Sequence, residues 1–373
     1  MSRSSRIIYV GLLLSLMSMP AMANEPVTID RGAAPHHPRQ PQIAVDAKGT
    51  VHVVYGVGNR VRYRRSFNGG KEFAQPVDLP VTQVISLGMR RGPRIAVSKN
   101  SVCVTVIGGP QGKGRDGDVL AFQSTDGGEN WNNPVKVNDV DASAREGLHA
   151  MAADAKGNLY CAWLDLRRDR SEVMAAASTD GGRTWTKNVL VYRSPDGSVC
   201  ECCHPSIATD DEGRVHVFWR NSLAGARDMY FATSGDGGKT FGAAVKMGSG
   251  SWPLDACPMD GGAIAARGDR IVSVWRRERS IFLVDGKRDE QRLGTGEQPW
   301  IALAETGPFV IWLKRRGDAA YLLTPASASP IPLSPHAADP VIATGPNGRG
   351  PVVAAWESRD GNRETIQCQV VQE

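Results

Sequence analysis

Ser178-Thr-Asp-Gly-Gly-Arg-Thr-Trp185 is one of four related octapeptides in this chain of 373 residues. The other copies begin at Ser66, Ser124 and Ser234, so successive starts lie 58, 54 and 56 residues apart. In each copy the Asp or Asn can bond the backbone two residues on, and the Gly pair supplies the positive φ that a tight turn needs. A fixed period of this size indicates a repeat architecture.

Strand patterns recur with the same period around these turns. In each unit a short strand precedes a strand rich in Val, Trp and Tyr, and an alternating strand then leads into the turn. Short strands at regular spacing with turn signals are typical of an all-β array, and four strands per unit are typical of a propeller blade. The sequence therefore predicts an all-β, six- or seven-bladed β-propeller of four-stranded antiparallel blades. The final unit, 339–371, has only three strands, so we expect the N-terminal strand 26–30 to close the ring.

The pattern Ser-x-Asp-x-Gly-x-x-Trp resembles the Asp-box of the sialidase (BNR-repeat) superfamily. This resemblance implies a propeller with structural boxes on one rim and an active site on the opposite rim. As an activity it implies exo-sialidase-like glycoside hydrolysis of acidic sugars. The box also occurs in propellers with unrelated functions, so it is stronger evidence for the fold than for the activity.

The first residues predict export. Arg3 and Arg6 precede an apolar run over 7–17, and Ala21-Met22-Ala23 provides small residues at a cleavage site. This pattern indicates a secretory signal peptide over 1–23, followed by a single propeller domain over 24–373. We expect a periplasmic or secreted protein that does not span a membrane, because no later stretch is long and apolar enough. No Lys/Arg run resembles a nucleic-acid footprint, so no nucleic-acid partner is expected.

Charged side chains concentrate in the loops that a propeller places opposite the boxes. These loops carry His36-His37, Arg90-Arg91, Arg145-Glu146, Lys314-Arg315-Arg316, His336 and Glu357-Ser-Arg359. One interpretation is the solvated rim of a basic-leaning protein. The other is an electropositive funnel that attracts an anionic small molecule or glycan.

The sialidase chemistry implied by the resemblance needs three arginines on the substrate carboxylate, an Asp acid/base and a Tyr nucleophile. Arginine suits this task because its fork binds a carboxylate bidentately. The catalytic candidates are Arg91, Arg94 and Arg277 for the carboxylate, with Asp165 or Glu146 as acid/base. The Arg-Ile-Pro motif typical of the family is absent before the first box, and Pro38-Arg39-Gln40-Pro41 is its nearest analogue. The family's catalytic set therefore does not carry over residue by residue.

A cysteine cluster departs most from a sialidase. Cys200-Glu-Cys-Cys-His204 precedes the fourth unit and Cys257-Pro-Met259 precedes the fifth, and such loops are neighbours in a closed ring. The candidate metal ligands are Cys200, Cys202, Cys203, His204, Cys257 and Met259. These soft ligands favour copper, as Cu(I), or zinc.

Exported proteins also form disulfides, and the seven cysteines of the chain cannot all pair. A disulfide, a metal site and a redox-active thiol all remain open, and a disulfide can coexist with a metal site. The sequence thus favours an exported propeller that binds a metal ion, an anionic ligand or both on its loop-rich rim. A sialidase-like hydrolase and a scaffold for a protein partner are the alternatives.

Overall fold

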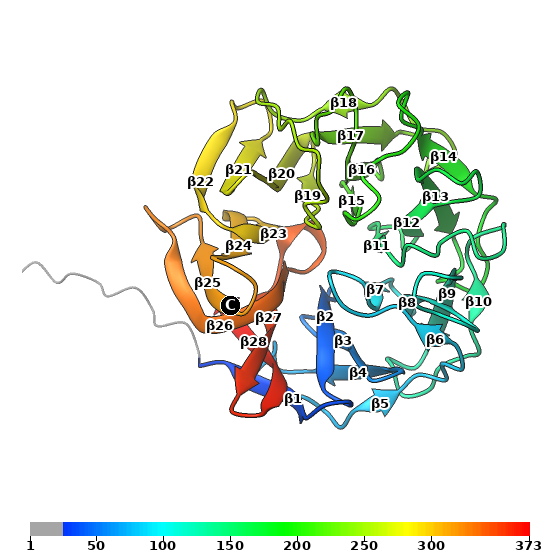
Figure 1. Ribbon diagram of the computed structural model, residues 1–373. Coiled ribbons are helices and arrows are strands. Elements are labelled where there is room, and N and C mark those ends of the chain that lie inside the picture. Colours follow the sequence, from blue (N-terminus) through cyan, green and yellow to red (C-terminus); the bar gives the residue numbers. More distant parts are fainter. Residues whose placement is uncertain (1–24) are drawn as a thin grey trace, which may run out of the picture.

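The computed structural model describes residues 25–373, which form a ring of β-sheets around a central axis (Figure 1). The signal peptide predicted for 1–23 lies outside the described residues. The all-β propeller predicted from the sequence is confirmed. Among residues 25–373, no helix has the length and apolar character needed to cross a membrane.

Five sheets of the ring are separate antiparallel meanders, ordered along the chain. The first contains β2 (Pro38–Val45), β3 (Val51–Val57), β4 (Arg60–Ser66) and β5 (Val77–Asp78). In the second, β6 (Val84–Ile85) and β7 (Arg94–Val97) both pair with β8 (Val102–Gly109), which is followed by β9 (Asp118–Ser124) and β10 (Val135–Lys136). The third contains β11 (His149–Ala153), β12 (Leu159–Asp165), β13 (Glu172–Ser178) and β14 (Val189–Tyr192).

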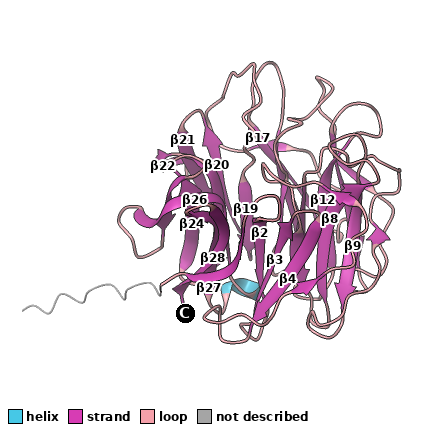
Figure 2. Ribbon diagram, turned by 60° about the horizontal axis from the view of Figure 1, so that its bottom comes forward, coloured by secondary structure: helices cyan, strands magenta, loops and turns pink. Residues whose placement is uncertain are grey.

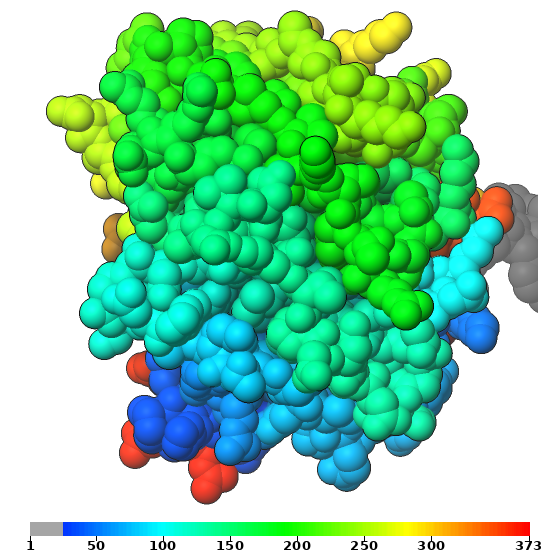
Figure 3. All heavy atoms as spheres, turned by 90° about the vertical axis from the view of Figure 1, so that its right-hand side faces the viewer, coloured from blue at the N-terminus to red at the C-terminus, as the bar shows by residue number. Residues whose placement is uncertain are grey.

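The next two sheets follow the same order. The fourth contains β15 (Ser206–Thr209), β16 (Val215–Arg220), β17 (Met229–Ser234) and β18 (Val245–Lys246). The fifth contains β19 (Ala263–Arg267), β20 (Arg270–Arg277), β21 (Ser280–Asp285) and β22 (Gln291–Thr295). A space-filling view shows the chain's colours passing in order from one region to the next, because each sheet packs on its neighbours in sequence (Figure 3).

The remaining strands form one seven-stranded sheet, ordered β1-β28-β27-β26-β25-β24-β23. Its strands are β1 (Val27–Gly32), β23 (Glu297–Ala304), β24 (Gly307–Leu313), β25 (Asp318–Leu323), β26 (Ile331–Ala343), β27 (Val352–Asp360) and β28 (Arg363–Gln372), with a 3-10 turn, η1 (Pro346–Gly348), after β26. β1 lies antiparallel to β28, with Val27 opposite Cys368.

This sheet corrects the expected division into six or seven four-stranded blades, since only five sheets stand alone. The physical reason is the length of β26, which has 13 residues. Its first part pairs with β25, where Ile331 lies opposite Leu322. Its second part pairs with β27, where Ala343 lies opposite Val353. One continuous strand therefore joins two units that the sequence pattern presents as separate.

The innermost strands surround a central channel of about 310 Å³. Its lining includes an alanine from each of seven strand segments: Ala44, Ala96, Ala152, Ala208, Ala265, Ala302 and Ala343. A small side chain is needed at these positions because the strands converge on the axis. The Ile-Ala repeats of the sequence therefore mark the strands that line the axis.

The boxes follow the third strand of their sheets and form the predicted turns. Ser124 Oγ donates to Asp126 Oδ1 at 2.7 Å and accepts from the Gly128 N–H at 2.8 Å. Asp126 also accepts the backbone N–H groups of Glu129 and Asn130. Hydrogen bonds from Asn130 and the other donors hold the pKa of Asp126 well below its usual value.

The boxes that begin at Ser124 and Ser178 also contact a neighbouring sheet. The Tyr63 hydroxyl donates to the Gly127 carbonyl at 3.0 Å, and Gln123 Nε2 donates to the Asp180 carbonyl at 2.9 Å. Gly128 has a φ of 95°, and a Cβ there would collide with the Tyr63 ring. These boxes therefore fasten one sheet to the next. The described chain consists almost wholly of strands and loops (Figure 2).

Replacing Asp180 by alanine should lower the free energy of unfolding by about 1–2 kcal/mol. The change removes acceptors for the Ser178 hydroxyl and for the backbone N–H and hydroxyl of Thr184. Urea unfolding measures the effect, with Asp211→Ala as a control at an exposed carboxylate. Equal stability of the two variants would contradict a structural role for the box carboxylate.

Candidate functional site

The rim opposite the boxes, here called the loop rim, consists of the loops before the innermost strands and the loops between second and third strands. A cavity of about 630 Å³ opens on this rim beside the first three sheets. Its charged and imidazole lining comprises His37, Arg39, Arg91, Lys113, Arg145 and Glu146. Four permanent cations thus face one carboxylate, which makes this cavity electropositive.

A second cavity of about 750 Å³ lies beside the first and shares His37 and Arg39 with it. The other ionisable residues in its lining are Arg316, His336, Glu357, Arg359 and Glu364. Within residues 25–373, neither the Arg39 side chain nor the Lys113 side chain makes a hydrogen bond or an ion pair with another residue. These two cations are therefore free to bind an anion.

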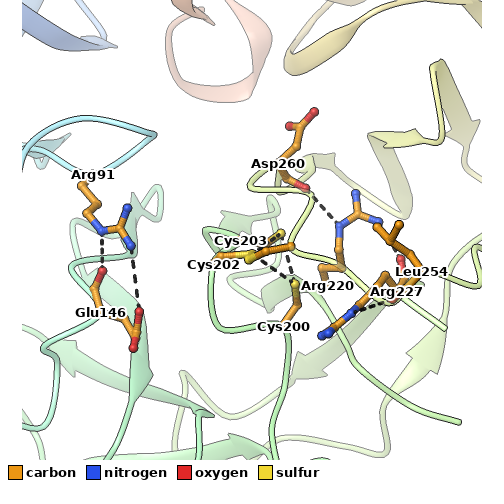
Figure 4. The surroundings of a disulfide bond; sticks show 10 residues. Arg91, Glu146, Cys200, Cys202, Cys203, Arg220, Arg227, Leu254 and Asp260 are labelled. Atoms are coloured by element: carbon orange, nitrogen blue, oxygen red, sulfur yellow. Dashed lines mark hydrogen bonds and ion pairs between the residues drawn. A yellow bond between two sulfur atoms is a disulfide. The ribbon is translucent and has the colours of Figure 1, made fainter. Parts of the chain in front are cut away.

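Glu146 and Arg91 both line the first cavity and contact each other directly (Figure 4). Arg91 Nε donates to the Glu146 carbonyl at 2.6 Å, and Arg91 Nη2 lies 3.9 Å from Glu146 Oε2. Burial raises the pKa of Glu146 above its usual value, although Arg91 opposes the shift. Arg91 and Glu146, which the sequence predicts as catalytic candidates, therefore lie side by side in the lining of one cavity.

Glu357 lines the second cavity and is only 8% exposed. It accepts hydrogen bonds from the Gln40 backbone N–H at 2.8 Å and from Gln40 Nε2 at 3.1 Å. Arg316 Nη2 lies 3.6 Å from its second oxygen. Burial and the nearby Asp339 carboxylate raise the pKa of Glu357 to about 7. A carboxylic acid that keeps its proton near neutral pH can serve as a general acid.

Left-handed backbone surrounds this carboxyl group. Gln40, Gln298 and Asp339 have φ values of 57°, 55° and 47°. Each directly precedes a proline at an equivalent position of its sheet. Gln298 Oε1 accepts the Asp339 N–H at 3.1 Å, and Asp260 accepts the Gln298 N–H at 2.9 Å. Strain of this kind is concentrated at functional sites, so the centre of the loop rim is the best candidate region.

The cysteines predicted to converge do lie together (Figure 4). Cys202 and Cys257 form a disulfide with a Cα–Cα distance of 6.3 Å. The Cys200 and Cys203 thiols lie 3.3 Å apart. The hydrogen bond between Cys200 and Cys203 lowers the pKa of Cys200 to about 7, with Arg220 and Arg227 acting in the same direction against burial. Burial raises the pKa of Cys203.

The other two predicted metal ligands are placed differently. His204 is buried and stacks on Trp300, with ring centroids 5.5 Å apart. Among the described residues, the group of potential ligand atoms within 4.8 Å of one another contains the sulfurs of Cys200, Cys202 and Cys203, without an imidazole nitrogen. Burial and nearby arginines hold the pKa of His204 well below its usual value. Met259 is half-buried and has a left-handed backbone with a φ of 51°.

Comparison with known proteins agrees with the boxes and the sheets. Residues 93–256 match the model of the BNR repeat-like domain, and this range contains three of the four boxes. This part of the β-propeller is thus similar to a BNR repeat-like domain. The predicted resemblance to the sialidase superfamily is confirmed by this match and by the solved structures that share the fold. At the level of sequence, no curated protein matches the propeller.

Solved structures similar to the propeller include several sugar-processing enzymes. An α-L-arabinanase of Penicillium chrysogenum, complexed with arabinobiose, has a TM-score of 0.59 at 13% identity, over 94% of this chain and 98% of that one. The intramolecular trans-sialidase of Ruminococcus gnavus, in complex with oseltamivir carboxylate, has a TM-score of 0.54 at 11% identity, over 91% and 96%. At such identities the likeness shows the fold alone.

The propeller brings only two of its five predicted catalytic residues to the rim cavities, namely Arg91 and Glu146. Arg94 is 3% exposed and donates to the backbone carbonyls of His149, Gly92, Pro93 and Arg90. Its position supports the backbone of the loop rim and gives no support to the substrate-binding role expected of it.

Asp165 and Arg277 bind other side chains of the propeller and line neither rim cavity. Asp165 is fully buried and accepts hydrogen bonds from Ser143, Trp163 and Arg167. Arg277 forms a bidentate pair with Glu290, with distances of 2.9 and 2.6 Å. Arg39, Lys113 and Glu357 were not among the predicted catalytic residues, although Arg39 and Glu357 lie in segments whose charge the sequence already indicated.

Proposed function

We propose that this propeller binds an acidic sugar, or a glycan that carries one, in the two adjoining cavities of the loop rim. The observation that carries the proposal is the electropositive first cavity, where four cations face one carboxylate and two of the cations are unpaired. Arginine forks suit a sugar carboxylate, and the volume lies within the range typical of small-molecule sites. The named arabinanase and trans-sialidase act on sugars with the same fold, which supports a carbohydrate ligand.

The pairing of β1 with β28 would hold the shared residues of this site in place. β1 lies against β28, and His37 and Arg39 follow β1 within the next seven residues. The two cavities therefore meet where the first sheet adjoins the last strands of the chain. The export expected from residues 1–23 would place this rim in the periplasm or outside the cell, where acidic glycans occur.

Glycoside hydrolysis is the second candidate, because carboxyl groups with raised pKa values line both cavities. Glu357 would be the general acid and Glu146 a second carboxyl group, as the chemistry of most glycosidases requires a pair. A general acid must lie within hydrogen-bond reach of the leaving oxygen, so the position of the bound sugar decides between binding and hydrolysis.

Replacing Arg39 by alanine should weaken the binding of an acidic sugar at least tenfold, or about 1.4 kcal/mol. Isothermal titration with sialic acid, and with glucuronate and galacturonate oligosaccharides, measures this change. Arg349→Ala is the matched control, since Arg349 is exposed and pairs with Glu305 instead of lining either cavity.

Neutral arabinobiose serves as the comparison ligand. Equal affinity for neutral and acidic sugars, or an Arg39→Ala variant that binds as the wild type does, would contradict the proposal. Fluorogenic sialosides and glucuronides assayed from pH 4 to pH 8 test hydrolysis separately. Activity that disappears in Glu357→Gln while binding persists would establish the second candidate.

A further inference from the structure

We propose that reduction of the Cys202–Cys257 disulfide opens a three-thiolate site for a soft metal ion, Cu(I) or Zn²⁺, on Cys200, Cys202 and Cys203. This inference is independent of sugar binding, because none of these cysteines lines the two rim cavities. The disulfide would act as a gate that keeps the third thiolate from the metal.

The three sulfurs already have the spacing of a metal site. Their separations are 3.3 Å between Cys200 and Cys203, 3.7 Å between Cys200 and Cys202, and 3.9 Å between Cys202 and Cys203. The point equidistant from them lies about 2.1 Å from each, close to the roughly 2.3 Å of a thiolate–zinc bond. An ion slightly out of this plane would contact all three sulfurs with little movement of the backbone.

Two arginines near the three sulfurs would stabilise the negative charge of a metal–thiolate centre. Arg220 and Arg227 lie close enough to act electrostatically on the Cys200 thiol (Figure 4). Three thiolates around Cu(I) or Zn²⁺ carry a net negative charge, which these guanidinium groups would partly offset. Thiolates are soft ligands and favour these ions over Mg²⁺ or Ca²⁺.

The cysteines differ sharply in solvent exposure, and this difference determines which sulfur of the disulfide a reductant attacks. Cys200 and Cys203 are each 1% exposed, whereas Cys257 is exposed to solvent. A dithiol reductant can therefore attack the Cys257 sulfur, which breaks the S–S bond and leaves its electron pair on Cys202 as a thiolate. The second thiol of the reductant then releases Cys257 and forms the reductant's own disulfide. The three thiolates of the site are complete only after this step.

The test compares metal affinity in the two redox states. Wild-type protein is reduced with dithiothreitol, desalted anaerobically, and titrated with Cu(I) against bicinchoninate and with Zn²⁺ against pyridylazoresorcinol. We expect the reduced protein to bind one ion at least tenfold more tightly than the oxidised protein. A thiol count under denaturing conditions verifies the states, since the oxidised protein has five free cysteines and the chain has seven.

Two variants separate the site from a general effect of reduction. Cys257→Ser frees Cys202 without any reductant, so it should bind metal under anaerobic conditions as tightly as the reduced wild type. Adding Cys203→Ser should weaken this binding at least tenfold, and adding Cys200→Ser gives a second version of that test should the first double variant fold poorly. Asp255→Asn, an exposed position on the loop of Cys257, should behave as the wild type.

Two results would overturn the proposal. One is a reduced wild type, or a Cys257→Ser variant, that binds neither ion more tightly than the oxidised wild type. The other is a folded double variant that binds as tightly as Cys257→Ser. Tight binding of only one of the two ions supports the site and identifies the metal.

Discussion

Replacing Arg90 by methionine should lower the free energy of unfolding by about 3–5 kcal/mol. Arg90 is 2% exposed and reaches from the second sheet to the seven-stranded sheet. Its Nη1 and Nη2 donate to the carbonyls of Pro340 and Gln298 at 2.9 and 2.8 Å, and its Nε lies 3.9 Å from Asp339 Oδ1. Methionine fills a similar volume but leaves two buried carbonyls and part of a buried carboxylate without partners.

Urea unfolding of Arg90→Met measures this loss. Arg349→Met is the control, because its exposed pair with Glu305 should contribute less than about 1 kcal/mol. A variant too unstable to purify agrees with the prediction. An Arg90→Met protein within about 1 kcal/mol of the wild type would show that the guanidinium does not hold the second sheet to the seven-stranded sheet.

Replacing Glu357 by glutamine should change how stability depends on pH. In the folded protein the pKa of Glu357 is raised to about 7, whereas the ordinary value is 4.5. Between these values the folded state binds the proton that the unfolded state has lost. The contribution of Glu357 to stability is therefore present at low pH and lost as the pH rises from about 5 to 8. The wild type should lose about 3 kcal/mol relative to Glu357→Gln across this window.

Parallel unfolding of the two proteins at pH 5 and pH 8 measures the difference. Glu364→Gln, in the lining of the same cavity, is the matched control and should follow the wild type. A stability difference between Glu357→Gln and wild type that stays constant from pH 5 to pH 8 would mean that Glu357 titrates normally. It would also remove the support that its pKa gives to a general-acid role.

The repeated turns were predictable because their information is local. Ser, Asp and two glycines within eight residues specify both the hydrogen bonds and the φ values of each box. The number of separate sheets was not predictable in this way, because β26 is defined by its two neighbours in space. Nothing in residues 331–343 signals that one strand continues from β25 to β27.

The sequence predicted which rim carries the candidate site, but it did not predict which residues line the cavities. Arg91 and Arg94 lie three residues apart, yet Arg91 lines a cavity from a loop whereas Arg94, at the start of β7, binds backbone carbonyls. Arg39 and Glu357 are far apart in sequence and share a cavity because the first and last sheets adjoin. The cysteine cluster was easier, since consecutive loops of a ring are neighbours whatever their length. The partner of each cysteine still depended on side-chain direction.

The shared strand β26 also limits how the protein can be engineered. A cut or an insertion within Ile331–Ala343 would interrupt the pairing with β25 or with β27, and both belong to one sheet. A split reporter or a tag placed there would separate the two halves of that sheet. The exposed turn at 287–289, between β21 and β22, offers a safer position for a fused domain, because it ends a hairpin and lines neither rim cavity.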